Sequence, residues 1–168
     1  QQIEHQQPSD WTAFENNARA ESRDQTQPSG APRPGHIKGI LDVSLDVIAK
    51  KSDFDRQFAD DLGRASSMGH NAHRFSISWA RLFPKEDVLE PDPAGVDFYA
   101  RVLDACARSS LVPFVTLHHF AMPAWLQRAS NGKRGVERAD AVLRFTHFAA
   151  TVASLFGDRV RYWCTLNE

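Results

Sequence analysis

Polar and charged side chains stand at the ends of three apolar segments of this sequence. Arg74 lies within "AHRFSISW", His118 and His119 follow "LVPFVTL", and Asn167 and Glu168 end "RYWCTLNE". A carboxyl group such as that of Glu168 can serve as a general acid and base, and an imidazole can exchange a proton near neutral pH. An arginine buried inside a barrel is costly unless a carboxylate partners it. Taken together, polar groups at three strand ends favour a functional site more than any one of them does alone.

Each of these residues also has an ordinary structural interpretation. Arg74 alone fits a structural ion pair, the histidine pair fits a loop closed by a hydrogen-bonding imidazole, and a lone Glu168 fits a solvated carboxylate. His70 and His73 are three positions apart, but no third ligand has recognisable spacing, so no metal site is expected. The choice between these interpretations depends on the elements that carry the residues.

The sequence predicts that helices and strands alternate along the chain. Apolar residues at helical spacing predict helices at 54–68, 93–106 and 142–156. Short apolar segments predict strands at 72–79, 111–117 and 159–168. Because the helical crossovers are long enough for parallel pairing, this order indicates an α/β fold with a parallel sheet. The carboxyl ends of such strands are where functional groups collect.

Capping residues and apolar stripes give these elements their expected limits and faces. Ser52 is the expected N-cap of the first helix, and Asp92 followed by Pro93 begins the second. The strand at 72–79 is expected to have one apolar face, formed by Phe75, Ile77 and Trp79. The third helix is expected to have one apolar stripe, which consists of Val142, Phe145, Phe148, Val152, Leu155 and Phe156.

Composition excludes several classes of protein. The 168 residues fit a single domain, with residues 1–50 predicted as a largely irregular loop region rich in Pro, Gly and Ser. A formal net charge of −1 gives no electrostatic case for a nucleic-acid partner, and no apolar stretch approaches the roughly 20 residues that cross a membrane. Cys106 and Cys164 fall on a helix face and inside a strand. This placement favours buried free thiols and a reducing, cytoplasmic location.

Five segments, in this order, resemble signature segments of the family 1 glycoside hydrolases, the retaining β-glucosidases and β-galactosidases. These segments are "QQIE", "SDWTAFE", "HRFSISWARLFP", "VPFVTLHHFAMPAWL" and "FGDRVRYWCTLNE". The resemblance implies a (β/α)8 TIM barrel. It also implies that the chain is the N-terminal portion of that barrel, roughly the second to fourth strands with their helices.

The resemblance implies roles for the matching positions only. Glu168 would be the general acid/base, and Asn167 would hydrogen-bond the sugar 2-hydroxyl. Arg74 would pair with the nucleophilic carboxylate and hold it ionised. Gln2 and His119 would bind hydroxyls elsewhere on the same sugar ring. No cofactor is implied, because two carboxylates supply the chemistry.

Two departures from the family pattern affect the expected function. Phe120 replaces the usual tryptophan, so it keeps an aromatic surface for the substrate but lacks an indole N–H donor. No segment matches the one that carries the family's nucleophile, and retention requires two carboxyl groups about 5–5.5 Å apart. The chain alone is therefore expected to be inactive.

The parent protein is expected to hydrolyse a small-molecule or oligosaccharide β-glycoside, with β-glucosides favoured as the family's commonest substrates. One alternative is a truncated, non-catalytic sugar-binding relic. Another is one half of a split barrel, which assembles with a complementary chain. The sequence does not predict the oligomeric state.

Overall fold

A computed structural model describes residues 53–167 of the chain. Its helices are α3 (Phe54–Ser67), α4 (Trp79–Leu82), α5 (Pro93–Arg108) and α6 (Ala141–Phe156). Its strands are β1 (Ala72–Ser76), β2 (Val112–His118) and β3 (Tyr162–Leu166). Two short 3-10 helices, η2 (Ala124–Gln127) and η3 (Gly135–Glu137), lie in the segment between β2 and α6.

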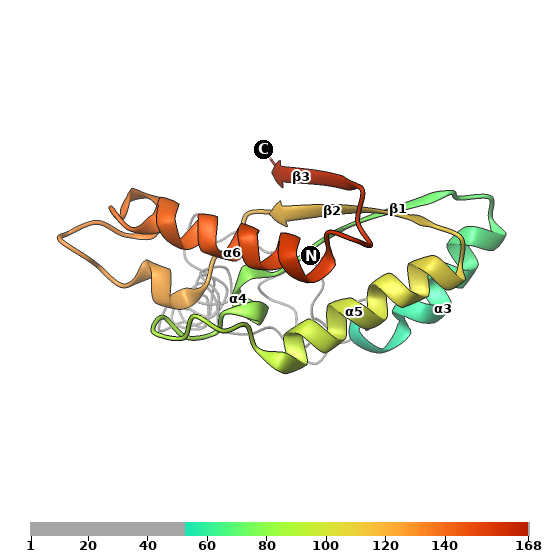
Figure 1. The fold of residues 1–168 in the computed structure, drawn as a ribbon, viewed down its shortest axis with the longest axis horizontal. Coiled ribbons are helices and arrows are strands. Elements are labelled where there is room, and N and C mark those ends of the chain that lie inside the picture. The colour runs from blue at the N-terminus through green and yellow to red at the C-terminus, as the bar shows by residue number, and fades with distance from the viewer. Residues whose placement is uncertain (1–52, 168) are drawn as a thin grey trace, which may run out of the picture.

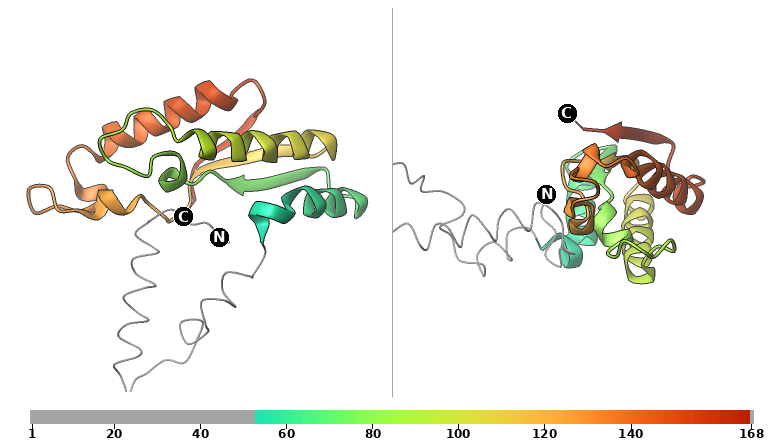
Figure 2. Two further views of the ribbon diagram at one scale, coloured as in Figure 1. Left: turned by 90° about the horizontal axis from the view of Figure 1, so that it is seen from below. Right: turned by 90° about the vertical axis from the view of Figure 1, so that its left-hand side faces the viewer.

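The three strands form one parallel sheet in the order β1-β2-β3. Helices α3, α5 and α6 lie on one face of this sheet (Figures 1 and 2). Register pairs Ser76 of β1 with Thr116 of β2, and Thr116 with Cys164 of β3. The predicted α/β fold with a parallel sheet is therefore confirmed, and the carboxyl ends of all three strands meet at one edge.

The starts of two helices follow from their capping residues. The carboxylate of Asp92 accepts a hydrogen bond from the backbone N–H of Gly95 at 2.9 Å, and Pro93 occupies the first turn of α5, as predicted. In α3 the N-cap position is Asp53, in a left-handed conformation with φ 48°. The predicted cap, Ser52, lies outside the described residues.

The strand predicted at 72–79 is shorter than expected. It ends at Ser76, and Trp79 begins the one-turn helix α4. The physical reason is local capping: the side chain of Ser78 accepts a hydrogen bond from the backbone N–H of Arg81. The hydroxyl of Tyr99 accepts the N–H of Ser78 at 2.7 Å, which holds this turn against α5.

The apolar stripe predicted for α6 is only partly buried. Phe148, Val152 and Phe156 are buried, whereas Val142 is 73% exposed and Leu155 is 37% exposed. Val142 and Leu155 lie at the two edges of the stripe, so the sheet and its neighbouring helices do not cover them. The buried part of α6 is therefore narrower than the apolar stripe that the sequence shows.

The core lies between the sheet and the helices and is rich in aromatic side chains. Trp79 stacks on Phe148 with ring centroids 5.4 Å apart and meets Trp125 edge to face at 6.0 Å. The nearly buried ion pair of Arg81 and Asp55 joins α4 to α3, with an N–O distance of 3.0 Å. Removal of one partner of such a pair typically costs about 3–5 kcal/mol, so this contact holds the two helices together.

Neither cysteine of the chain forms a disulfide. Cys106 is fully buried in α5, as predicted, and its burial raises the pKa of the thiol to about 11. Cys164 is half-buried in β3. The thiol of Cys106 is therefore protonated and unreactive at neutral pH.

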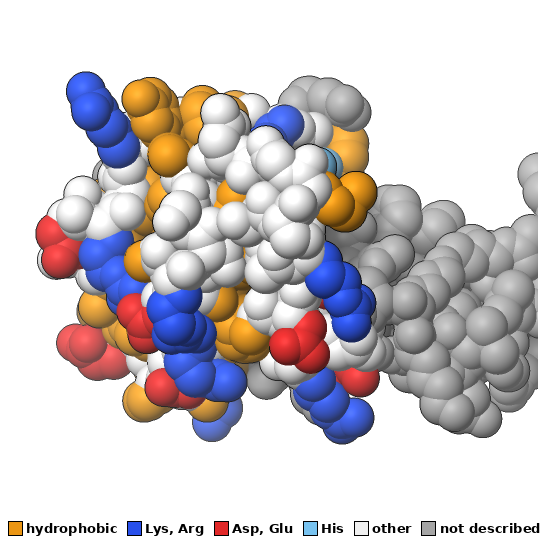
Figure 3. Space-filling model, turned by 90° about the vertical axis from the view of Figure 1, so that its right-hand side faces the viewer, with side chains coloured by type: hydrophobic (Ala, Val, Ile, Leu, Met, Phe, Trp, Pro, Cys, Tyr) orange, Lys and Arg blue, Asp and Glu red, His pale blue; other side chains and the backbone are white. Residues whose placement is uncertain are grey.

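The surface of the described residues carries both signs of charge. Figure 3 shows Lys and Arg side chains interspersed with Asp and Glu side chains on one face, so this face forms no uniform basic patch. Within residues 53–167, no helix combines the length and the apolar character that a membrane crossing requires.

An apolar cavity of about 440 Å³ lies open between α6 and β3. Its lining includes Leu117, Phe145, Ala149 and Trp163. Tyr162 and Leu166 of the neighbouring edge strand are also exposed, at 42% and 62%. An edge strand beside open apolar surface favours association between copies.

The isolated 168-residue chain is therefore expected to self-associate and to unfold without a cooperative transition. Size-exclusion chromatography with light scattering would measure the association, and urea unfolding would measure the cooperativity. The complete polypeptide that contains the chain is the control, since its additional segments are expected to cover the cavity. A monomeric isolated chain with a single sharp unfolding transition would contradict this expectation.

Candidate active site

The carboxyl edge of the sheet gathers the polar groups at the strand ends. β1, β2 and β3 end at Ser76, His118 and Leu166. The pairing of β2 with β3 extends one residue further, because the backbone N–H of Asn167 donates to the carbonyl oxygen of His118 at 2.9 Å. This bond places Asn167 at the sheet edge, beside the side chains of the two preceding strands.

Arg74 crosses the sheet from β1 toward β3. Its Nε donates to Oγ1 of Thr116 at 3.1 Å, and its Nη2 donates to Oδ1 of Asn167 at 2.6 Å. Thr116 is fully buried, so it supplies a fixed acceptor in the centre of the sheet. No carboxylate within residues 53–167 forms an ion pair with Arg74. The guanidinium is therefore a positive charge held in place by neutral acceptors, and it can attract an anionic group at this edge.

His119 lies on the same face as Arg74. Its Nδ1 is 3.0 Å from Oγ of Ser76, two positions beyond Arg74 in β1. This hydrogen bond fixes the ring orientation and leaves Nε2 as the other polar atom of the ring. The ring of His118 instead lies 6.3 Å from the ring of Phe145 on α6. Arg74, Asn167 and the residues beside them at the carboxyl edge of the sheet are called the strand-end site. Of the two adjacent histidines, His119 is thus the one at this site.

Phe120 presents an aromatic surface beside His119. Its ring centroid is 5.1 Å from that of His119, and the side chain is 51% exposed. The backbone has φ 64°, and the N–H of Ala121 bonds to the carbonyl of His119 across this tight turn. A left-handed phenylalanine is strained by about 1–3 kcal/mol, and strain of this kind clusters at ligand sites.

The structure brings together four of the six site residues that the sequence predicts. Arg74, His119, Phe120 and Asn167 all lie at the carboxyl edge of the sheet. Gln2 and Glu168 lie outside the described residues.

Sequence reasoning did not include two hydrogen-bonding residues among the site candidates. Thr116 and Ser76 hold the side chains of Arg74 and His119. Two signals were available: Thr116 is the one polar residue in "LVPFVTL", and Ser76 follows Arg74 at the two-residue spacing of one strand face.

His70 and His73 do not form part of a metal site among residues 53–167, where no group of three potential ligands is close enough to hold an ion. His73 stacks on Phe54 at 6.3 Å and on Phe75 at 5.8 Å. Burial, and secondarily the charge of His70, lowers the pKa of His73 below its ordinary value of 6.5. A neutral imidazole in an aromatic stack is the role that this geometry supports.

The lowered pKa of His73 is expected to make stability fall in acid. The folded state binds fewer protons than the unfolded state, so the free energy of unfolding decreases as the pH falls through about 6.5. In the complete polypeptide, His73→Phe should therefore lose less stability than the parent between pH 7.5 and pH 5.5, as measured by urea unfolding. His70→Gln is the comparison and should have a smaller effect in the same direction. Identical pH dependence in the parent and His73→Phe would contradict the assignment.

Comparison with known proteins gives a consistent result. Residues 40–168 match the profile of the family described as Glycosyl hydrolase family 1. An aryl-phospho-β-D-glucosidase, BglA, of Bacillus subtilis (strain 168) is 38% identical over 116 residues, which are 69% of this chain and 24% of that protein. The putative β-glucosidase 41 of Arabidopsis thaliana is 38% identical over 136 residues, 81% of this chain and 24% of its own length. The chain thus spans about a quarter of the length of these relatives.

Solved structures show the same relationship. A β-glucosidase from Thermotoga maritima in complex with cyclophellitol superposes with a TM-score of 0.72 at 28% identity, covering 96% of this chain and 31% of that one. The rice Os3BGlu6 β-glucosidase superposes with a TM-score of 0.63 at 36% identity, covering 69% of this chain and 23% of that one. The three-stranded sheet therefore corresponds to part of a TIM barrel, as the sequence predicted.

Proposed function

The chain belongs to glycosyl hydrolase family 1, and on that premise we propose that the polypeptide containing it is a retaining β-glycosidase that favours β-glucosides. The observation that carries the proposal is the 2.6 Å contact between Arg74 and Asn167 at the carboxyl edge of the sheet. Within residues 53–167, a guanidinium without a carboxylate partner and an amide meet there, at the edge where TIM barrels place their active sites.

In the proposed first step, a carboxylate from another part of the polypeptide attacks the anomeric carbon of the sugar. The bond to the glycosidic oxygen breaks, and that oxygen takes a proton from Glu168. The product is a covalent glycosyl ester. In the second step, Glu168 takes a proton from water, the water oxygen attacks the anomeric carbon, and the nucleophile is released as a carboxylate.

Arg74 is proposed to hold the nucleophile ionised. A guanidinium within about 4–6 Å of a carboxylate lowers the pKa of that carboxylate, so the nucleophile stays charged at neutral pH. Thr116 and Asn167 each satisfy one nitrogen of Arg74. These bonds fix the position of the guanidinium before substrate arrives, which is the preorganisation that electrostatic catalysis requires.

The remaining site residues are proposed to bind the sugar. The amide of Asn167 is suited to the 2-hydroxyl, where hydrogen bonds strengthen in the transition state. His119, oriented by Ser76, and Gln2 are proposed partners for other hydroxyls. The exposed ring of Phe120 is proposed to contact an apolar face of the substrate.

A specific observation also favours one half of a split barrel as a second candidate function. The apolar cavity between α6 and β3 is open to solvent in residues 53–167, and its lining resembles an internal packing surface. In this case a separate chain supplies the nucleophile and covers the cavity. The residues of the strand-end site would have the same roles.

The direct test is to express the complete polypeptide and measure hydrolysis of three 4-nitrophenyl glycosides, the β-D-glucoside, the β-D-galactoside and the 6-phospho-β-D-glucoside. Proton NMR of the first sugar released should show the β-anomer, since double displacement retains configuration. The isolated chain, with one of the two required carboxylates, should be inactive. If its activity appears only after a complementary chain is added, the split-barrel candidate holds. Release of the α-anomer would overturn the retaining mechanism.

A further inference from the structure

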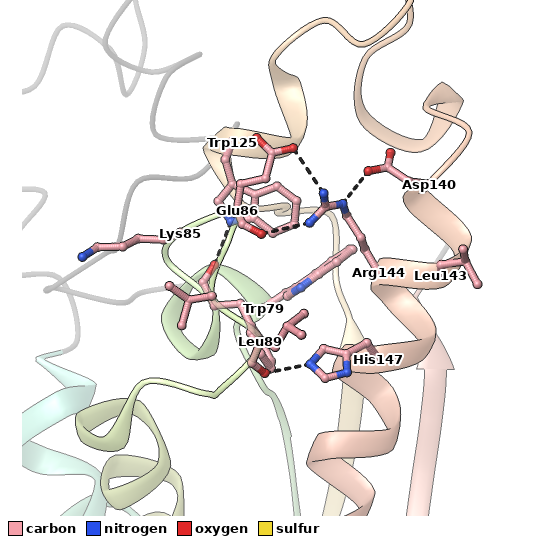
Figure 4. A pocket seen from close by; sticks show the side chains of 11 residues that line it. Trp79, Lys85, Glu86, Leu89, Trp125, Asp140, Leu143, Arg144 and His147 are labelled. Atoms are coloured by element: carbon pink, nitrogen blue, oxygen red, sulfur yellow. Dashed lines mark hydrogen bonds and ion pairs between the residues drawn. The ribbon is translucent and has the colours of Figure 1, made fainter.

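A second cavity, of about 380 Å³, lies between the segment that follows α4 and the first turns of α6 (Figure 4). Its volume falls in the range of small-molecule sites, about 300–1,000 Å³. Trp79, Phe83 and Trp125 form aromatic walls, and Val88, Leu89 and Leu143 contribute aliphatic ones. The cavity shares no residue with the strand-end site, so a ligand bound here would not require the glycosidase mechanism.

Trp79 lines the cavity, and its indole N–H has no hydrogen-bond partner within residues 53–167. Trp79 is 5% exposed, yet its Nε1 forms no hydrogen bond within the described part of the chain. Although the residue is largely buried, Nε1 itself is not a buried atom, so its N–H can donate to an acceptor that enters the cavity. By contrast, the neighbouring Trp125 donates its Nε1 proton to the carbonyl of Phe83 at 2.8 Å. A hydrogen-bond acceptor on a ligand could accept the Nε1 proton of Trp79 in the same way.

The charged residues of this region are already paired with one another. Arg138 donates to Glu86 at 2.6 Å and to both oxygens of Asp140, while Arg144 donates to Asp140 at 2.5 Å and to the backbone carbonyl of Glu86 at 3.0 Å. Hydrogen bonds from Arg138 and Arg144 hold the pKa of the Asp140 carboxyl well below its usual range. Each carboxylate thus has a cationic partner, and neither is available to pair with a cationic ligand.

The remaining polar side chains direct no free charge into the cavity in this arrangement. Lys85 extends away from the cavity (Figure 4). Nε2 of His147 lies 2.8 Å from the carbonyl oxygen of Leu89, so this ring nitrogen is occupied. A charged ligand would therefore lose its hydration without gaining an opposite charge, which disfavours both anions and cations.

The rim of the cavity is apolar and open. Leu143 is 73% exposed and Leu89 is 69% exposed, and both lie where a ligand would enter. Single exposed apolar residues are ordinary, but here they surround a hollow with an aromatic floor. Covering them with a ligand ring would remove apolar surface from water on both partners.

We propose that this cavity binds a neutral aromatic molecule with one oxygen that accepts a hydrogen bond from Trp79, a class that includes phenols and aryl alcohols. The aromatic walls favour a planar ring, and the single unpaired donor favours one acceptor. A sugar fits less well, because its several hydroxyl groups would lack partners. The site is independent of the proposed glycosidase function.

The test uses the complete natural polypeptide, labelled with nitrogen-15 in its tryptophan indoles, and benzyl alcohol as the probe. Titration at pH 7 is expected to shift the Nε1–H resonance of Trp79 to saturation, and Trp79→Phe identifies that resonance by its loss. The affinity of Trp79→Phe for benzyl alcohol, followed by ligand NMR, should be about fivefold weaker, since one hydrogen bond is lost while an aromatic ring remains.

A matched pair of variants locates the site. Leu143 and Val142 are adjacent in α6 and both 73% exposed, but only Leu143 lines the cavity. Leu143→Gln should weaken the binding of benzyl alcohol about fivefold, because apolar contact at the rim is lost. Val142→Gln should leave the affinity for benzyl alcohol unchanged. Benzoate and benzylamine, which carry a charge on the same ring system, should bind less tightly. The proposal is overturned by a Trp79 resonance that does not saturate, by equal affinities in the two variants, or by tighter binding of either charged probe.

Discussion

Replacing Glu168 with Gln in the complete polypeptide is expected to lower kcat for β-glycosides with poor leaving groups by about 10²–10⁴-fold. Glutamine cannot donate the proton that an alkoxide leaving group needs. An activated leaving group, such as the 2,4-dinitrophenolate of a 2,4-dinitrophenyl β-glucoside, departs without that proton. This substrate should therefore still form the covalent intermediate, which then accumulates because its hydrolysis lacks a general base. Rapid-mixing measurements should show a burst of dinitrophenol followed by slow turnover.

The comparison between the two substrate classes decides the assignment of Glu168. Glu137→Gln is a suitable control, because Glu137 is exposed in η3 and makes no contact with the strand-end site. It should behave like the parent with both substrates. If Glu168→Gln slowed formation of the covalent intermediate equally from both substrate classes, Glu168 would not be the acid/base.

Replacing Arg74 with Met is expected to lower kcat/KM by about 10²–10³-fold, the effect typical of removing one electrostatic contact from an active site. Without the guanidinium, the pKa of the nucleophilic carboxylate should rise. The acidic limb of the pH profile of kcat/KM should consequently move to higher pH. Steady-state assays from pH 4 to pH 8 would measure both effects.

Two further variants separate charge from structure at Arg74. Arg74→Lys keeps the charge but loses the two-nitrogen contact with Thr116 and Asn167. Its activity should therefore lie between those of Arg74→Met and the parent, and its pH profile should be close to that of the parent. Arg101→Met is the control, since Arg101 forms an exposed ion pair with Asp97 on α5. Arg101→Met should have the kcat/KM and the pH profile of the parent. An unshifted acidic limb in Arg74→Met would contradict the proposed contact with the nucleophile.

The order and type of the elements could be predicted because both depend on local patterns. The apolar period of about 3.6 residues in α5 and the Asp92–Pro93 start belong to one short stretch of chain, so they are visible in the sequence. The prediction failed where two local patterns compete. In 72–79 the alternation of apolar residues continues to Trp79, but capping by Ser78 ends the strand and starts α4.

The choice between the two adjacent histidines also required the structure. Strict alternation from Thr116 would place His118 on the face of Arg74. Instead the ring of His118 lies against Phe145, and His119 bonds to Ser76. Alternation applies only while the strand is regular, and the chain leaves β2 at this point. The family resemblance indicated His119, whereas periodicity alone did not.

Local patterns and family signature segments were enough to identify the chain as an α/β segment of a glycosidase barrel with polar groups at three strand ends. Which of these groups meet depends on the way the strands and helices pack. Arg74 lies 42 residues from Thr116 and 93 residues from Asn167, and these distant contacts exist because the parallel register places the strand ends side by side. The indole N–H of Trp79, which has no partner within residues 53–167, and the paired charges around Arg138 likewise depend on how α6 packs against the segment after α4. Local periodicity encodes which elements form, but packing between them decides which side chains touch.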